Sequence, residues 1–258
     1  MKLGLVTYNL ASAWDLKTLE EHCVQTGFEG VELRTTHAHG VELALSPAER
    51  ADLRERLADS PIQYVGLGSV YEYDSPDPDQ LKENIEGTKE YIRLAHDVGI
   101  GGIKVRPNRV HDDLGIEREA TFAQIGRSLN ECAVYAADWG VEVRIEVHGK
   151  VTCEPAHMRT IMDHAPHANA RVCWNSNMAD IVDGEIDGSF ALLGDRIGMV
   201  HITELWNEYP WRRLFNLLRE GGYDGYCLAE IPASEDPLRL MRYYRALWLA
   251  LGGERQHA

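Results

Sequence analysis

The sequence predicts one α/β domain over residues 1–258, folded as a parallel (β/α)₈ barrel. The length of 258 residues is close to that of a single such barrel. Strand-like apolar runs alternate with helical stretches, and eight strand–helix units can be counted. Four apolar runs in the second half end on Glu146, Asn175, His201 and Glu230. Because a parallel barrel gathers the carboxyl ends of its strands around one pocket, we expect these four side chains to converge there.

Eight short apolar segments are expected to form the strands, since barrel strands are buried on both faces. They are Leu3–Tyr8, Gly30–Leu33, Ile62–Leu67, Ile103–Arg106, Val141–Val147, Arg171–Asn175, Met199–Ile202 and Tyr226–Ile231. No linker, low-complexity tract or shift in composition divides them, which favours one domain.

Helices are expected after each strand, from apolar residues at helical spacing. They cover Asp15–Thr26, Pro47 to about Asp59, Asp77–Val98, Glu117–Trp139, Pro155–His164, a short Gly188–Leu193, Pro210–Glu220 and Pro237–Leu251. Ser46 and Glu49 form a capping box, with a proline between them at the first helical position. Gly27 and Gly99 stop two helices.

The composition argues against several classes of partner. A net charge of −15 disfavours nucleic acid, because phosphate binding needs a basic face. No apolar run approaches the roughly 18 residues of a membrane span. The segment MKLGLVTYNL indicates a first strand and not a signal peptide. The five cysteines are scattered without a CxxC pair, which fits reduced thiols and a cytoplasmic location.

Charged residues inside the predicted strands need a reason, because these strands should be apolar. Side chains two residues apart point to the same side of a strand. The sets that share a side are Glu32 with Arg34, Lys104 with Arg106, and Arg144 with Glu146 and His148. For Lys104 and Arg106, a role in structural ion pairs and a position facing the pocket are equally consistent with the sequence. Glu32 and Arg34 fit the structural role somewhat better.

Glu146 and Glu230 are lone carboxylates at the ends of apolar runs. Two carboxylates about 4 Å apart repel by roughly 4 kcal/mol at an effective dielectric near 20, so a proton or a cation must lie between them. His201 lies on a strand that comes between these two glutamates in the sequence. Because an imidazole is a good metal ligand, its presence favours a cation over a shared proton. Two carboxylates, an imidazole and the amide oxygen of Asn175 suit Mn²⁺ or Mg²⁺, while Zn²⁺ and Co²⁺ are compatible.

Three short motifs occur at these residues: IEVHG around Glu146 and His148, VHITE around His201, and CLAEI around Glu230. In this order and spacing the chain resembles, over essentially its whole length, the sugar isomerase/epimerase superfamily with the xylose isomerase-like TIM barrel. The resemblance implies that Glu146 and Glu230 bind a metal and move protons, and that His201 is a ligand.

The chain departs from the family pattern at three positions. Asn175 stands where the resemblance implies a ligating aspartate, Met178 where a histidine often follows, and Asn207 where epimerases commonly have an arginine. An asparagine keeps an oxygen ligand but removes a negative charge. We therefore expect weaker metal binding and less basic glutamates.

The resemblance implies a metal-dependent isomerase or epimerase that acts on a small sugar or polyhydroxy carbonyl compound through an enediolate. Lys104, Arg106, His148 and Trp174 are expected to orient the substrate or stabilise its oxyanion, although His148 fits a supporting role equally well. The same first step serves a lyase, as in a dehydratase or hydratase of a keto-sugar or inosose. A barrel that has lost the chemistry is a further alternative.

A DNA-repair function, found in the same superfamily, would need further ligands. His37, His39 and His111 are the candidates for them, and the acidic charge disfavours it. We expect a small-molecule substrate as the partner. Aromatic residues near Pro210 are compatible with a homo-oligomer.

Overall fold

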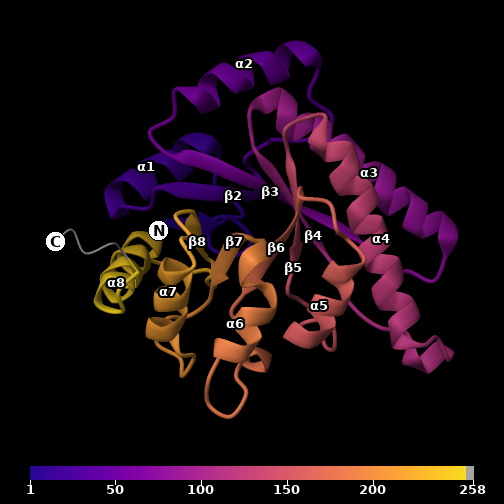
Figure 1. Ribbon diagram of the computed structural model, residues 1–258. Helices are drawn as coiled ribbons and strands as arrows, with labels where there is room; N and C mark the ends of the chain where they lie inside the picture. The colour runs from indigo at the N-terminus through magenta and orange to yellow at the C-terminus, as the bar shows by residue number, and fades with distance from the viewer. Residues whose placement is uncertain (254–258) are drawn as a thin grey trace.

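In a computed structural model, which describes residues 1–253, the chain forms a closed eight-stranded parallel barrel ringed by helices (Figure 1). The strands are β1 (Lys2–Val6), β2 (Gly30–Arg34), β3 (Gln63–Glu72), β4 (Gly102–Arg106), β5 (Glu142–Glu146), β6 (Ala170–Asn175), β7 (Ile197–Ile202) and β8 (Tyr226–Ala229). The predicted fold class is confirmed. The last five residues of the predicted domain, 254–258, lie outside the described residues.

The helices follow the strands in the expected order. They are α1 (Leu16–Thr26), α2 (Pro47–Ala58), α3 (Pro78–Val98), α4 (Arg118–Ala137), α5 (Pro155–Asp163), α6 (Asp187–Leu193), α7 (Trp211–Glu220) and α8 (Pro237–Ala250). Short 3₁₀ turns lie at Asp112–Leu114, Met178–Asp180 and Gly194–Arg196. Within residues 1–253, no helix combines the length and apolar character needed to cross a membrane.

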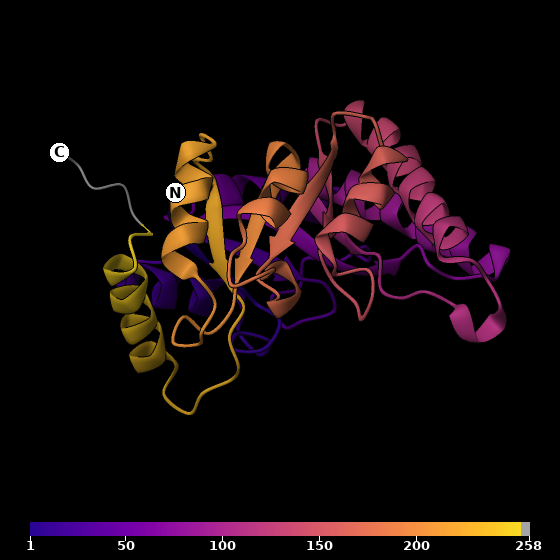
Figure 2. The same ribbon diagram turned by 60° about the horizontal axis from the view of Figure 1, so that its bottom comes forward.

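Each strand pairs in parallel with the next, and β8 pairs with β1 to close the ring. Closure leaves no free sheet edge and brings all the strand ends to one rim. In Figure 2 the arrowheads of the strands in view point toward the lower edge, where the loops that follow them lie. The carboxyl ends of β5, β6, β7 and β8 therefore share that rim.

Side chains alternate between the two faces of each strand, so the barrel has two separate apolar clusters, one on each face. Leu3, Leu5 and Val105 are fully buried and belong to the large apolar cluster between barrel and helices. A separate small cluster of Val6, Cys173, Met199 and Leu228 forms from the opposite side of the strands. Burial of both faces explains the nearly continuous apolar runs of the sequence.

Strand β3 is longer than the sequence predicts, since it continues past Leu67 to Glu72. Its pairing with β4 is interrupted after Gly68 and resumes where Glu72 lies beside Arg106. The Arg106 guanidinium also pairs with the Glu72 carboxylate at 2.6 Å. This contact between Glu72 and Arg106 extends β3. Because the two residues are far apart in sequence, the local pattern of apolar residues does not predict the extension.

The predicted start of α2 is confirmed in detail. The Ser46 hydroxyl accepts a hydrogen bond from the Glu49 amide at 3.4 Å, and the Glu49 carboxylate accepts one from the Ser46 amide at 2.8 Å. Gly27 and Gly99 end α1 and α3 with φ of 74° and 80°, a left-handed conformation that suits glycine.

Replacing Ser46 with alanine removes one half of this capping box. We expect Ser46→Ala to lower the free energy of unfolding by about 1 kcal/mol, because an amide at the start of α2 loses its acceptor. Urea unfolding measures the change. Ser46→Thr keeps the hydroxyl as both acceptor and donor to Glu49 and should lose less than half as much; an equal loss in both variants would contradict the capping role.

Candidate metal and substrate site

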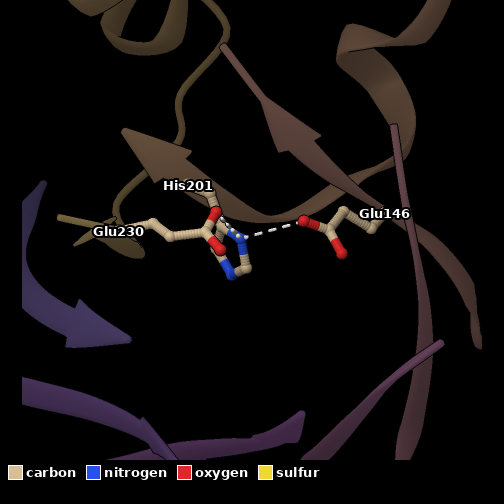
Figure 3. Close-up of side chains that lie close together, drawn as sticks. All are labelled: Glu146, His201 and Glu230. Atoms are coloured by element: carbon tan, nitrogen blue, oxygen red, sulfur yellow. Dashed lines mark ion pairs between the residues drawn. The ribbon is translucent and has the colours of Figure 1, made fainter. Parts of the chain in front are cut away.

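Four strand ends meet at the rim, as predicted. Glu146 ends β5, Asn175 ends β6, His201 lies in β7 and Glu230 directly follows β8. Asn175 and His201 are direct neighbours in the β6–β7 pairing. Figure 3 shows the His201 ring between the carboxylates of Glu146 and Glu230.

Three of these side chains form a compact set of donor atoms. The Nδ1 atom of His201 lies 3.5 Å from Oε1 of Glu146 and 3.6 Å from Oε2 of Glu230. Ligand atoms of all three residues lie within 4.8 Å of one another, an arrangement that could hold a metal ion. His201 and Glu146 are buried, whereas Glu230 is partly exposed.

Asn175 lies beside this set with its amide nitrogen toward it. Its Nδ2 donates a hydrogen bond of 3.2 Å to Oε1 of Glu146. Its Oδ1 is buried and has no hydrogen-bond partner among residues 1–253. An amide nitrogen cannot bind a cation, so Asn175 must turn its side chain over before its oxygen can serve as a ligand.

Lys104 neutralises part of the negative charge. Its Nζ lies 2.7 Å from Oε2 of Glu146 and 3.9 Å from Oε1 of Glu32, and its side chain is buried. Burial acts to raise the pKa of Glu146, but the charges of Lys104 and His201 outweigh it and hold that pKa well below its usual value. Glu146 is therefore ionised, with Oε2 held by Lys104.

The His201 imidazole lies among negative groups. Burial acts to lower its pKa, but Cys173, the Glu32 carboxylate and the nearby Glu146 carboxylate together raise that pKa well above the ordinary value. The ring is therefore held in a strongly negative environment, which favours a cation at this place.

A cavity of about 310 Å³ opens above these residues. Its lining is mainly polar and consists of Tyr8, Arg34, Ser69, Lys104, Arg106, Glu146, His148, Asn175, Asn177 and Glu230. The structure therefore brings Lys104, Arg106 and His148 to the same cavity as the two glutamates. Arg106 lines the cavity and also pairs with Glu72, so the two roles considered for it coexist.

The expected substrate contact of Trp174 needs correction. Trp174 is fully buried, packs against Phe190 of α6 and donates a hydrogen bond of 3.3 Å to the Tyr209 hydroxyl. Consecutive strand residues face opposite sides, so Trp174 must point outward when Asn175 points into the cavity. The tryptophan supports β6 from behind.

Several residues at the site were not predicted from the sequence to belong to it. Arg34, Tyr8, Ser69 and Asn177 line the cavity, and Glu32 lies beneath it, with Oε1 3.4 Å from Nε2 of His201. For Glu32 and Arg34 the signal was present, because both share one side of β2. A structural role was the preferred interpretation for them, since the register that faces them toward β7 cannot be read from β2 alone.

Asp180 supports the loop after β6. It is buried, and its Oδ2 accepts hydrogen bonds from the Tyr209 hydroxyl at 2.8 Å and the Asn177 amide at 3.0 Å. Burial raises the pKa of Asp180 to about 7, although these two hydrogen bonds act against the rise. Because Asn177 lines the cavity, Asp180 connects its wall to the buried aromatic residues.

Residues 21–248 match the sequence profile of the xylose isomerase-like TIM barrel family, and the chain belongs to that family. The predicted resemblance is thereby confirmed.

Three proteins illustrate the relationship. A human protein named "Putative hydroxypyruvate isomerase" is 22% identical over 245 residues, 86% of each chain. The D-psicose 3-epimerase of Clostridium cellulolyticum H10, solved with D-tagatose, superposes with a TM-score of 0.80 at 17% identity, covering 99% of this chain and 100% of that one. The IOLI protein, solved with a bound zinc atom, gives 0.81 at 16% identity over 100% of both chains.

Asn175→Asp tests the place of Asn175 at the site. We expect tighter divalent-cation binding, because a third carboxylate joins Glu146 and Glu230. In the absence of cation the variant should be less stable, since the new charge faces Glu146 in place of an amide donor. Titration calorimetry with Mn²⁺ and thermal unfolding with and without Mn²⁺ measure both effects. Unchanged or weaker Mn²⁺ binding would mean that Asn175 does not contact the ion.

Asp180→Asn tests the buried carboxyl. The folded-state pKa of about 7 lies above the ordinary 3.8, so the contribution of Asp180 to stability is fully present below pH 3.8 and is lost as pH rises to 7. The neutral variant lacks this loss. Its stability relative to the parent should rise between pH 4 and pH 8, by on the order of 3 to 4 kcal/mol.

Denaturant unfolding across this pH range measures the slope. Asp183→Asn, an exposed residue of the same loop, is the matched control and should leave the slope unchanged. Parallel pH profiles of the parent and Asp180→Asn would contradict the raised pKa.

Proposed function

We propose that this protein is a divalent-metal-dependent isomerase or epimerase of a small sugar or polyhydroxy carbonyl compound. The observation that carries the proposal is the convergence of Glu146, His201 and Glu230 at the carboxyl rim, beneath a polar cavity of about 310 Å³. Barrel enzymes place their chemistry at this rim. The family and its epimerase neighbours support the same class of reaction.

The residues present fit a divalent cation. Two carboxylates and an imidazole offer donor atoms within 4.8 Å, and Nδ1 of His201 is buried without a hydrogen-bond partner among residues 1–253. Such a donor set suits Mn²⁺ or Mg²⁺ and is compatible with Co²⁺ and Zn²⁺. When bound, the cation would polarise the substrate carbonyl and stabilise the negative charge that develops on its oxygen.

The two glutamates are suited to different parts of the proton transfer. Within the described residues, the Glu230 carboxylate has no side-chain hydrogen bond and faces the cavity, so it is free to take the proton α to the carbonyl. Both oxygens of Glu146 are occupied, one by Lys104 and one by Asn175. We assign to the ionised Glu146 carboxylate the transfer of the hydroxyl proton between the two oxygens of the enediolate, while Glu230, protonated in the first step, returns its proton to carbon.

The rest of the cavity wall binds and orients the substrate. Arg34, Lys104, Arg106 and His148 line the cavity, and the first three bring positive charge to it. Cationic donors at an oxyanion stabilise an enediolate relative to the neutral carbonyl compound. Enediolate formation is the first step of isomerisation and epimerisation, and dehydration of a keto-sugar begins with the same proton abstraction.

One observation favours a second candidate, a ligand-binding barrel without metal chemistry. Lys104 and the Asn175 amide already satisfy both oxygens of Glu146. In that case the cavity would bind a polyhydroxy compound and leave its carbon–hydrogen bonds intact.

Proton exchange separates the two candidates. In this test the Mn²⁺-supplemented protein would be incubated in D₂O with hydroxypyruvate, D-fructose or D-tagatose. NMR would follow the incorporation of deuterium at the carbon next to the carbonyl. Exchange is expected for at least one compound. Glu230→Gln and Glu146→Gln should each slow it by a factor of 10² or more, since each removes a proton-transfer group.

Metal content gives the independent check. Elemental analysis of the purified protein, before and after addition of Mn²⁺, should find about one divalent ion per chain. A protein that neither contains nor takes up such an ion, and that catalyses no exchange, would overturn the proposed function and leave the binding role.

A further inference from the structure

Glu32 lies on β2 in the barrel interior and is fully buried. Neither of its oxygens makes a hydrogen bond within residues 1–253. Two groups approach it: Nε2 of His201 at 3.4 Å and Nζ of Lys104 at 3.9 Å. A carboxylate removed from water costs several kcal/mol unless paired charges offset it, so its place beside these two groups needs a reason.

The neighbouring strand leaves room for this carboxylate. Glu32 pairs with Gly66 of β3, and Gly68 follows on the same side of that strand. A Cβ atom at Gly68 would lie 2.9 Å from Oε1 of Glu32, closer than real Cβ contacts allow. Glycine at position 68 thus lets Glu32 extend across the barrel toward β7.

The two edges of the His201 ring face different carboxylates. Nε2 faces Glu32, while Nδ1 faces Glu146 and Glu230. A neutral imidazole carries its hydrogen on one nitrogen and a lone pair on the other. A carboxylate beside Nε2 holds the hydrogen there and turns the lone pair of Nδ1 toward the other two glutamates.

We propose that Glu32 is a positioning residue, which fixes His201 with its hydrogen on Nε2 and its Nδ1 lone pair toward the cation site between Glu146 and Glu230. This inference rests on the proposed function, because it assigns His201 as a metal ligand. The Lys104 ammonium lies near the carboxylates of both Glu32 and Glu146, and its positive charge reduces the repulsion between them.

Glu32→Gln tests the role with little change in shape. The amide is uncharged and can present either an oxygen or an NH₂ group to Nε2, so it no longer selects one tautomer. We expect the dissociation constant for Mn²⁺ to rise 10- to 100-fold, as for other carboxylates that support a metal-bound histidine. Glu142→Gln, in the same barrel but paired with Arg144 and Arg171, is the control and should leave the constant unchanged.

Nitrogen-15 NMR of the Zn²⁺-loaded parent reads the tautomer directly and needs no Glu32 variant. His201, assigned by comparison with His201→Gln, should show a hydrogen on Nε2 and zinc on Nδ1. Zinc on Nε2, or equal Mn²⁺ binding by Glu32→Gln and the parent, would overturn the positioning role while leaving the proposed function in place. A parent that binds neither ion would overturn both.

Discussion

Charges inside the closed barrel must be balanced inside it, and this constraint shapes the site. The interior offers little water, so each buried ion needs a partner or a cation at short range. Glu32, Glu146 and Glu230 are three carboxylates around His201, and Lys104 is the ammonium among them. With His201 neutral, as a metal ligand must be, these groups carry three negative charges and one positive charge, an excess of two that a divalent ion would offset. The same balance explains why Lys104 and Glu146 are both ionised although both are buried.

Asn175 adds no charge to this balance. As an amide it donates a hydrogen bond to Oε1 of Glu146, where an aspartate would add a further negative charge. Glu32 lies at the opposite edge of the His201 ring, further from the cavity. Glu146 and Glu230 thus lie on the cavity side of the ring, and one carboxylate lies behind it.

The sequence was sufficient for the barrel, for most strand and helix ends, and for the meeting of Glu146, His201 and Glu230, because alternation, helix caps and strand ends are local signals. Its errors have two causes. Trp174 was assigned to the cavity although its neighbour Asn175 already faced it, and strand parity allows one of the two. Glu32 and the extension of β3 to Glu72 depend on contacts with His201 and Arg106 across the barrel. Such contacts depend on the register between neighbouring strands, and the order of residues along one sequence does not reveal that register.

The pairing of β8 with β1 has a consequence for the two sides of His201. Glu146, His201 and Glu230 lie on or directly after β5, β7 and β8, and the strands β5 to β8 are joined by consecutive pairing. Glu32 lies on β2, so its approach to Nε2 of His201 spans the barrel interior and depends on the closed ring. A divalent ion that binds only the folded arrangement would stabilise the closed barrel by mass action.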